Sequence, residues 1–238
     1  MNLFIDTNIF LSFYHLTSDD LEELKKLAVL LRERKMQLLL PDQVIQEFRR
    51  NRENKIADAL KRLRDQKLSL QFPQLCKDYD EYTRLRQLQK DYEGNHVELL
   101  RRIAEDVKNE SLKADTTLQE LFGLATRIAA DDSIVDQARL RVEIGNPPGK
   151  SGSLGDAISW EALLTTVPNG QDLYLITDDK DYCSPLDGSV FNSFLLQEWE
   201  EKKESRLFYY RRLSSFFKER FPDIKLASLS FPFGAEVK

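Results

Sequence analysis

Short apolar segments that each run into an acidic residue or a proline constrain the fold of this chain more than any other feature. Asn2–Ile5 ends on Asp6, and Met36–Leu40 is stopped by Pro41. A third segment, DLYLIT at residues 172–177, leads into a run of aspartates. Long stretches with helical periodicity separate the three, and strands that alternate with helices favour a parallel sheet with crossover helices. The sequence therefore predicts an α/β fold in three layers, with a central parallel sheet.

Helix-start and turn residues place the remaining elements. Thr, Ser, Asp and Pro are typical of the first helical positions, and clusters of Gly and Pro are typical of turns. The expected elements are a helix at 16–34 with Thr17 or Ser18 as its N-cap, a helix from 41–42 onward, a turn-rich loop at 145–155, a helix opened by Asp156, helices over about 190–220 and an edge strand at 224–229.

The middle of the chain, from about residue 51 to 140, is almost unbroken helix-forming sequence rich in Leu, Arg, Lys, Glu and Gln. Breaks are expected only at Phe72-Pro73 and around Gly94. We expect a large helical insertion here, within one domain that spans residues 1–238. A coiled-coil hairpin is the alternative, although no clean heptad pattern persists for the ~3–4 repeats that would indicate one.

Composition argues against several classes of protein. No segment reaches the ~18 consecutive apolar residues of a membrane-spanning helix, and the N-terminus lacks the basic region of a signal peptide. We therefore expect a cytoplasmic protein without a membrane partner. Cys76 and Cys183 lie far apart and His15 and His96 are unaccompanied, which argues against a disulfide framework and against a zinc site.

The charge distribution is uneven. The net charge of -5 argues superficially against a nucleic-acid partner, because binding to phosphates relies on Lys and Arg. The segment from Phe48 to Lys67 departs from that average, with eight basic residues against three acidic ones. This segment, which includes Arg49, is a candidate for phosphate contacts. An ordinary solvated helix face is the alternative.

Acidic residues are predicted to meet at one edge of the sheet. Parallel sheets place their functional residues beyond the carboxyl ends of the strands. The acids concerned are Asp6 after the first strand, Glu47 about two turns into the next helix, Asp156 after the glycine-rich loop, and Asp178, Asp179 and Asp181 after the DLYLIT strand. Carboxylates gathered in one pocket repel one another unless cations neutralise them, and Mg²⁺ or Mn²⁺ suits a site that must admit phosphate and water. Two such ions ~4 Å apart can promote an in-line displacement at a phosphodiester.

Four segments around these acids resemble PIN-like domains. They are FIDTNIF around Asp6, LPDQVIQEF around Glu47, GDAISWEALL around Asp156 and LYLITDDKDY around Asp179. The chain looks most similar to the large prokaryotic PIN-like nucleases with a long helical insertion, of which GNPPGK and LLQEWEEKK, around Trp199, are also typical. The resemblance covers both ends of the chain, whereas the middle third carries no matching motif.

The resemblance implies a metal-dependent nuclease that uses Mg²⁺ or Mn²⁺ to hydrolyse phosphodiester bonds, with RNA favoured over DNA as its substrate. The implied catalytic and metal-binding acids are Asp6, Glu47, Asp156 and Asp179, with Asp181 as an auxiliary ligand. Thr7 or Asn8 is expected to fix the Asp6 carboxylate through hydrogen bonds. The usual T-x-D-x-D-F spacing selects Asp179 before Asp181 and leaves Asp178 in the variable position. Substrate contacts are expected from Asn8, Arg49 and Lys150.

Other readings remain open at this stage. Each acid has an ordinary structural role available, as a helix cap, a surface carboxylate or part of a solvated turn. A DNA or flap-type nuclease would use the same acids, and a non-catalytic module would recruit a protein partner through the helical insertion. A haloacid-type phosphomonoesterase is disfavoured, because Asp6 is followed by Thr7 and Asn8 instead of a DxD pattern.

Two patterns are set aside. GNPPGKS lacks the four-residue spacing between glycines of a phosphate-binding loop, and its prolines remove backbone amides that would bind phosphate. Lys150 in that segment is a candidate contact to a substrate phosphate or, equally, an exposed loop lysine. Four aromatic residues at helical spacing are expected in the core and not as platforms for stacking bases. These are Trp160, Trp199, Phe216 and Phe217.

Overall fold

The computed structural model describes residues 1–14, 21–149 and 153–224 of the chain. Its centre is a five-stranded sheet in the order β3-β2-β1-β4-β5, in which every neighbouring pair of strands is parallel. The strands are β1 (Asn2–Ile5), β2 (Gln37–Pro41), β3 (Thr126–Ile128), β4 (Leu173–Ile176) and β5 (Leu207–Tyr210). The predicted α/β class with a central parallel sheet is confirmed.

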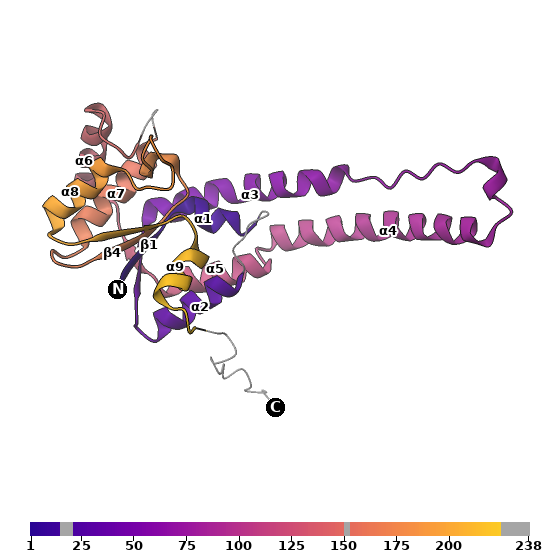
Figure 1. Cartoon of the computed structure of the whole chain (residues 1–238), viewed down its shortest axis with the longest axis horizontal. Coiled ribbons are helices and arrows are strands. Elements are labelled where there is room, and N and C mark those ends of the chain that lie inside the picture. Colours follow the sequence, from indigo (N-terminus) through magenta and orange to yellow (C-terminus); the bar gives the residue numbers. More distant parts are fainter. Residues whose placement is uncertain (15–20, 150–152, 225–238) are drawn as a thin grey trace.

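Helices cover both faces of this sheet (Figure 1). One layer contains the helices α2 (Leu21–Arg32), α5 (Lys113–Leu124) and α9 (Leu213–Arg220). Within it, α2 contacts both α5 and α9. The other layer is centred on α7 (Leu154–Thr166), which contacts α3 (Asp42–Asp65), α6 (Asp132–Glu143) and α8 (Ser193–Lys203), and the short helix α1 (Thr7–Ser12) packs on α3. The sheet is therefore sandwiched between two layers of helices, as the sequence predicts.

The central strands are buried along their whole length because both faces are covered. All four residues of β1 and all four of β4 are buried. For this reason the sequences of these strands are continuously apolar and do not alternate between apolar and polar residues. The expectation for the four aromatic residues is confirmed, because Trp160, Trp199, Phe216 and Phe217 are at most 3% exposed. None of them is available to stack on a base.

A long helical arm projects from one side of this body (Figure 1). The arm consists of the C-terminal half of α3, residues 66–79 with a short 3-10 helix at Gln74–Cys76, and α4 (Asp80–Lys108). It belongs to the connection from β2 to β3. No residue of α4 is fully buried, and several apolar side chains of the arm are exposed, among them Leu75, Leu88 and Val97.

The helical insertion expected at residues about 51–140 is corrected in three respects. Its first part continues α3, and its last part, α5 and most of α6, packs on the body. The strand β3 interrupts it, although two of its three residues are exposed and carry no strand pattern, because pairing with β2 creates this strand. Gly94 does not break α4, since a glycine inside an exposed helix costs only ~1 kcal/mol.

Three further expectations need correction or fall outside the described residues. The strand β5 interrupts the helices expected over about 190–220, because its sequence LFYY fits an edge position beside β4. The helix α7 begins at Leu154, so Asp156 lies in its first turn and does not open it. Thr17, Ser18 and residues 225–229 of the expected edge strand lie outside the described residues. Among the helices that are described, none has both the length and the apolar composition for crossing a membrane.

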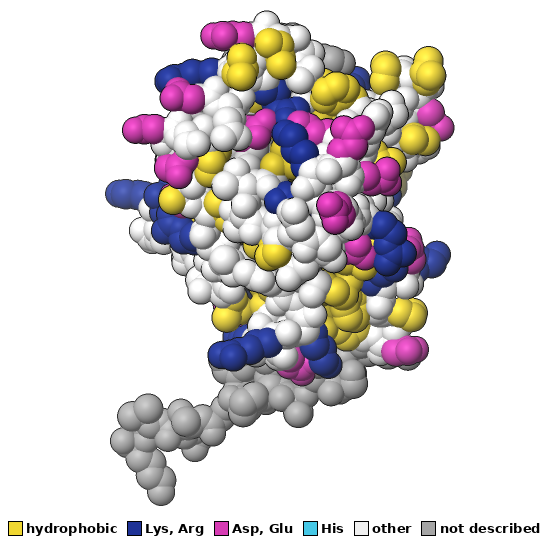
Figure 2. Space-filling model, turned by 90° about the vertical axis from the view of Figure 1, so that its left-hand side faces the viewer, with side chains coloured by type: hydrophobic (Ala, Val, Ile, Leu, Met, Phe, Trp, Pro, Cys, Tyr) yellow, Lys and Arg dark blue, Asp and Glu magenta, His cyan; other side chains and the backbone are white. Residues whose placement is uncertain are grey.

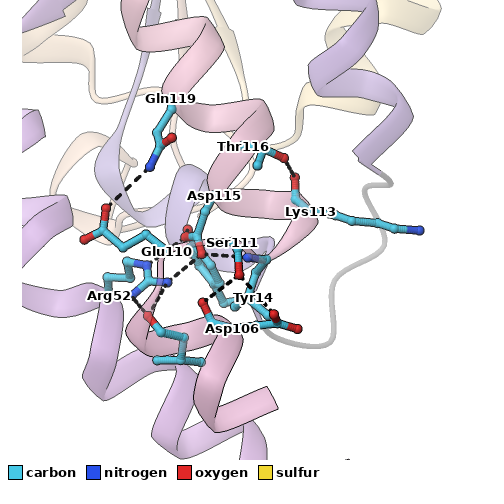
Figure 3. A network of polar contacts seen from close by, with 11 residues as sticks. Tyr14, Arg52, Asp106, Glu110, Ser111, Lys113, Asp115, Thr116 and Gln119 are labelled. Carbon is cyan, nitrogen blue, oxygen red and sulfur yellow. Dashed lines mark hydrogen bonds and ion pairs between the residues drawn. The ribbon is translucent and has the colours of Figure 1, made fainter. Parts of the chain in front are cut away.

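The base of the arm is fixed by a buried ion pair (Figure 3). Arg52 of α3 donates two hydrogen bonds to the carboxylate of Asp115 in α5, at 2.7 and 2.6 Å, and its guanidinium also reaches the backbone oxygen of Val107 at 3.3 Å. Tyr14 donates to the same carboxylate, and so does the backbone amide of Leu112. One guanidinium thus ties α3 to the end of α4 and to the start of α5.

We predict that Arg52→Met destabilises the protein by about 3–5 kcal/mol, because it leaves the buried Asp115 carboxylate without its countercharge. Urea unfolding measures this loss. The matched control is Arg127→Met, which removes the exposed pair between Arg127 and Asp42 and is expected to cost at most ~1 kcal/mol. Equal losses in the two variants would show that the Arg52 pair does not hold the base of the arm.

Candidate active site

Asp6 occupies the centre of the sheet edge at which the parallel strands end. It follows β1, the middle strand, and its backbone amide donates to the oxygen of Ile176 at the end of β4 at 2.9 Å. Its side chain is 6% exposed and accepts from the backbone amide of Thr7 at 2.6 Å, which also caps α1. Capping a helix and belonging to a cluster of acids are therefore compatible roles for this residue.

Thr177 connects Asp6 with the acidic run that follows β4. Its hydroxyl donates to the second carboxylate oxygen of Asp6 at 2.6 Å and accepts from the backbone amide of Asp179 at 3.0 Å. The Asp179 side chain in turn accepts from the backbone amide of Asp181 at 2.9 Å and caps a short 3-10 helix at Lys180–Tyr182. One fully buried hydroxyl thus holds the carboxylate of Asp6 beside the loop that carries Asp179.

Glu47 and Asp156 approach this pair from two helices. Glu47 lies in the second turn of α3 and accepts from the hydroxyl of Thr7 at 3.5 Å. Gly155 allows the start of α7 to approach α3 closely, because a Cβ at that position would lie 2.7 Å from Gln43 Nε2 and 3.5 Å from Glu47 Oε2. Asp156 is the next residue, and its carboxylate accepts from Ser153 at 3.3 Å.

The four carboxylates are close enough to influence one another's ionisation. Burial raises the pKa of Asp6 to about 7, and the negative charges of Asp156, Glu47 and Asp179 contribute to that rise. Burial likewise raises the pKa of Asp156 to about 7, with contributions from Asp179 and Glu47. The pKa of Glu47 is also raised, mainly by burial, although the nearby cation Arg50 opposes the shift. The structure therefore brings Asp6, Glu47, Asp156 and Asp179 near enough to one another, at one edge of the sheet, for their charges to interact.

The other residues expected at the site are placed as follows. Asp181 adds to the negative potential at Asp156, whereas Asp178 is exposed and pairs with Arg211. Asn8 contacts the Thr177 hydroxyl at 3.4 Å, so the Asp6 carboxylate is fixed by Thr7 and Thr177 and not by Asn8. Lys150 lies outside the described residues.

A second basic residue of α3 lies near these acids. Arg50 lowers the pKa of Glu47, while Arg49, the expected phosphate contact, is exposed and stays a prediction. The two residues are adjacent in sequence, but they point about 100° apart around the helix axis. From the sequence, Thr177 is only the first position of the T-x-D-x-D-F spacing, and the contacts of its hydroxyl with Asp6 and Asp179 are not predicted.

A buried ionic network supports the loop that leads to Asp156. Arg141 of α6 donates to Glu161 of α7 at 2.6 Å, to the backbone oxygen of Pro147 at 2.6 Å and to Glu198 of α8 at 2.5 Å. Trp160 donates to the second oxygen of Glu198 at 2.8 Å. The GNPPGK and LLQEWEEKK segments, which are far apart in sequence, therefore meet at one guanidinium.

The chemistry of the donor set fits a hard divalent cation. The acids offer only carboxylate oxygens, which Mg²⁺ and Mn²⁺ prefer, and burial and neighbouring negative charges raise the pKa values of Asp6 and Asp156, so that a bound cation would stabilise their ionised forms. The buried side-chain oxygen of Asn8 has no hydrogen-bond partner in the described part of the chain. No three Asp, Glu, His or Cys side chains among the described residues are close enough together to enclose one ion.

Comparison with known proteins places the chain in a family. The sequence profile of the PIN domain matches residues 3–182, a range that contains Asp6, Glu47, Asp156 and Asp179. No curated protein matches the chain. The profile covers well over half of the sequence and agrees with the resemblance carried by the four acidic motifs. We conclude that this protein belongs to the PIN domain family, whose fold is of the nuclease type.

Proposed function

We propose that this protein is a metal-dependent endoribonuclease that uses Mg²⁺ or Mn²⁺. The observation that supports the proposal is the approach of Asp6, Glu47, Asp156 and Asp179 from four distant segments, where burial and mutual repulsion raise the pKa values of Asp6 and Asp156 to about 7. Negative charge gathered in this way is costly unless a cation neutralises it. Membership of a family with a nuclease-type fold supports the same reaction class.

In this proposal Asp6, Asp156 and Asp179 hold the ion, and Asp181 is an auxiliary ligand. A divalent ion bound there would supply Lewis acidity to a phosphate oxygen and would acidify a water molecule. Glu47 is a ligand or orients the attacking water, because Thr7 and Arg50 favour its ionised form. Thr177 favours the ionised form of Asp6 by donating a hydrogen bond to its carboxylate, which partly offsets the rise in pKa that burial causes.

Substrate contacts are assigned to residues around the acids. Asn8 has an unpartnered buried oxygen beside Thr177, which is available to a ligand or a water molecule. Arg50 carries positive charge beside Glu47 and is exposed, so it is placed to bind a phosphate that flanks the bond being cut. Lys150 is assigned to a phosphate from its place in the sequence before Asp156.

We expect the purified protein to cut a single-stranded RNA oligonucleotide in Mg²⁺ or Mn²⁺, because the acids need a cation before they can admit a phosphate. EDTA should abolish cleavage, and excess Mg²⁺ should restore it. The assay compares RNA with DNA of the same sequence on denaturing gels. Isothermal titration calorimetry with Mg²⁺ measures binding of the ion in parallel.

The outcomes separate the alternatives. Faster cleavage of DNA would replace the ribonuclease assignment with a DNA or flap-type nuclease that uses the same acids. Binding of Mg²⁺ without cleavage of either oligonucleotide would identify a non-catalytic module. Cleavage that persists in EDTA would contradict the proposed role of the acids.

A further inference from the structure

The basic residues of α3 are unusual for their lack of partners. Of the eight in the segment from Phe48 to Lys67, only Arg52 forms a hydrogen bond or an ion pair with a described residue. On α4, by contrast, Arg101 and Arg102 both pair with Glu98. Positive charge is therefore neutralised at these two positions of α4, whereas the exposed cations of α3 are left without a carboxylate partner among the described residues.

Some of these cations share one face of the helix with the candidate active site. Positions spaced by alternating steps of four and three residues form one stripe along a helix. The stripe begins where α3 lies against Gly155. It contains Gln43, Glu47, Arg50, Asn54, Ala57, Lys61 and Arg64. Beyond Glu47 every stripe residue is exposed, and none is acidic. We call this set the α3 stripe.

The α3 stripe faces away from the rest of the arm. Arg52 and Ile56, which are buried, lie on the opposite side of the helix, where Arg52 reaches the end of α4. The acidic residues of this part of α3 border the stripe, since Glu53 lies three residues from Arg50, and Asp58 and Asp65 lie three and four residues from Lys61. Within the described part of the chain, none of the three forms an ion pair with a stripe residue. The helix rises 1.5 Å per residue, so Arg64 lies ~26 Å along the axis from Glu47.

A polynucleotide strand is the partner that fits such a surface. Its charges repeat at regular intervals, so a strand that runs along the stripe presents several phosphates to it. A strand held at the acids by one phosphodiester can continue past Arg50 toward Lys61 and Arg64. Positive charges in a row that starts at the site match this path.

The opposite end of the molecule shows a different distribution of charge. Figure 2 views the body from the side turned away from the arm, and there Lys and Arg side chains are interspersed with Asp and Glu side chains. Since phosphate binding depends on uncompensated Lys and Arg, this face lacks the property that distinguishes the α3 stripe.

We propose that the α3 stripe binds the sugar-phosphate backbone of the substrate several nucleotides away from the bond that is cut, so that the enzyme prefers long strands. The inference rests on the proposed nuclease function for its substrate class. It adds that affinity comes from the arm and is independent of base sequence, because phosphates carry no sequence information. RNA and DNA are therefore expected to bind the stripe alike.

The test measures binding in EDTA, so that no cleavage interferes. Fluorescence anisotropy with a labelled single strand of about 25 nucleotides gives the dissociation constant as a function of salt concentration. The double variant Lys61→Ala and Arg64→Ala is expected to bind about 10-fold more weakly, and the slope of log K against log salt should fall by ~1.4, the loss of two phosphate contacts to a single strand. Each single variant should lose about half of that slope.

Arg62→Ala is the matched control, because Arg62 is exposed, basic and adjacent to Lys61 but points about 100° away from it around the helix. It should bind with the wild-type salt dependence. An unchanged slope in the double variant, an equal loss in the Arg62 variant, or no binding by the wild-type protein would overturn the inference. A slope that changes as expected in a protein that never cuts RNA or DNA would support the stripe and refute the nuclease proposal instead.

Discussion

The Asp6→Asn variant is expected to cut RNA at least ~10²–10³-fold more slowly than the wild-type protein, a loss typical of removing one preorganised group that stabilises developing charge. The substitution removes one negative charge and keeps the volume of the side chain. It also keeps an oxygen that can accept from Thr7, so the cap of α1 survives. The initial rate of cleavage in saturating Mg²⁺ measures the effect.

Asp178→Asn is the control for this variant. Asp178 belongs to the same acidic run as Asp179, but it is exposed and pairs with Arg211. We expect its activity to stay within about 2-fold of the wild-type value, because exposed ion pairs contribute little. Wild-type activity in the Asp6 variant, or an equal loss in both variants, would remove Asp6 from the proposed site.

The second large effect is a loss of stability at neutral pH when divalent ions are removed. A carboxyl group whose pKa is raised on folding favours the folded state only while it is protonated. For Asp6 and Asp156, whose pKa values rise from 3.8 to about 7, that contribution is complete below pH 3.8 and is lost as the pH rises to about 7. Each group can account for up to about 4 kcal/mol, at 1.36 kcal/mol for each pKa unit.

Urea unfolding in EDTA at pH 5 and at pH 8 tests this effect. The free energy of unfolding of the wild-type protein should fall between the two values, and that of Asp6→Asn should fall less because one of the two groups is absent. Added Mg²⁺ should restore the stability of the wild-type protein at pH 8, since a ligand that binds only the folded state stabilises it. If the free energy of unfolding fell by the same amount in both proteins between pH 5 and pH 8, the raised pKa of Asp6 would be contradicted.

The sequence predicts the centre of the fold well because burial on both faces leaves a plain pattern. The strands β1, β2 and β4 are apolar along most or all of their length, and each ends where an acid or a proline begins a new element. Their parallel order places Asp6 and Asp179 at one edge. The convergence of the acids follows from topology alone and needs no knowledge of side-chain contacts.

The edges of the sheet could not be predicted because neighbours create them. β3 has one buried residue among three, and β5 is a short aromatic segment between helices, so each depends on the strand beside it. The same reason explains why Arg141 was missed. Arg141 binds Glu161, Glu198 and the backbone of Pro147 at the same time. These partners come from three segments of the chain, and the spacing of residues in the sequence does not predict that the segments meet.

The orientation of individual side chains at the site could not be predicted from the sequence. Arg49 and Arg50 are adjacent basic residues in one helix, and only the helix rotation decides which of them lies beside Glu47. Thr177 directly follows the apolar strand β4, and the sequence alone gives its hydroxyl no partner. Its function becomes visible only in its contacts with Asp6 and Asp179.

The central strand of the sheet comes from the N-terminus, while its neighbour β4 comes from far along the chain. The hydrogen bond between Thr177 and Asp6 joins positions 171 residues apart. Contacts at such long sequence separation form late and slow the folding of a domain. During synthesis β1 can pair early with β2, but it must wait for the segment that contains β4 before its second neighbour exists. A nascent chain with Asp6 and Glu47 but without Asp156 and Asp179 holds half of the acids, so the proposed site stays incomplete until the segment through Asp179 has been made.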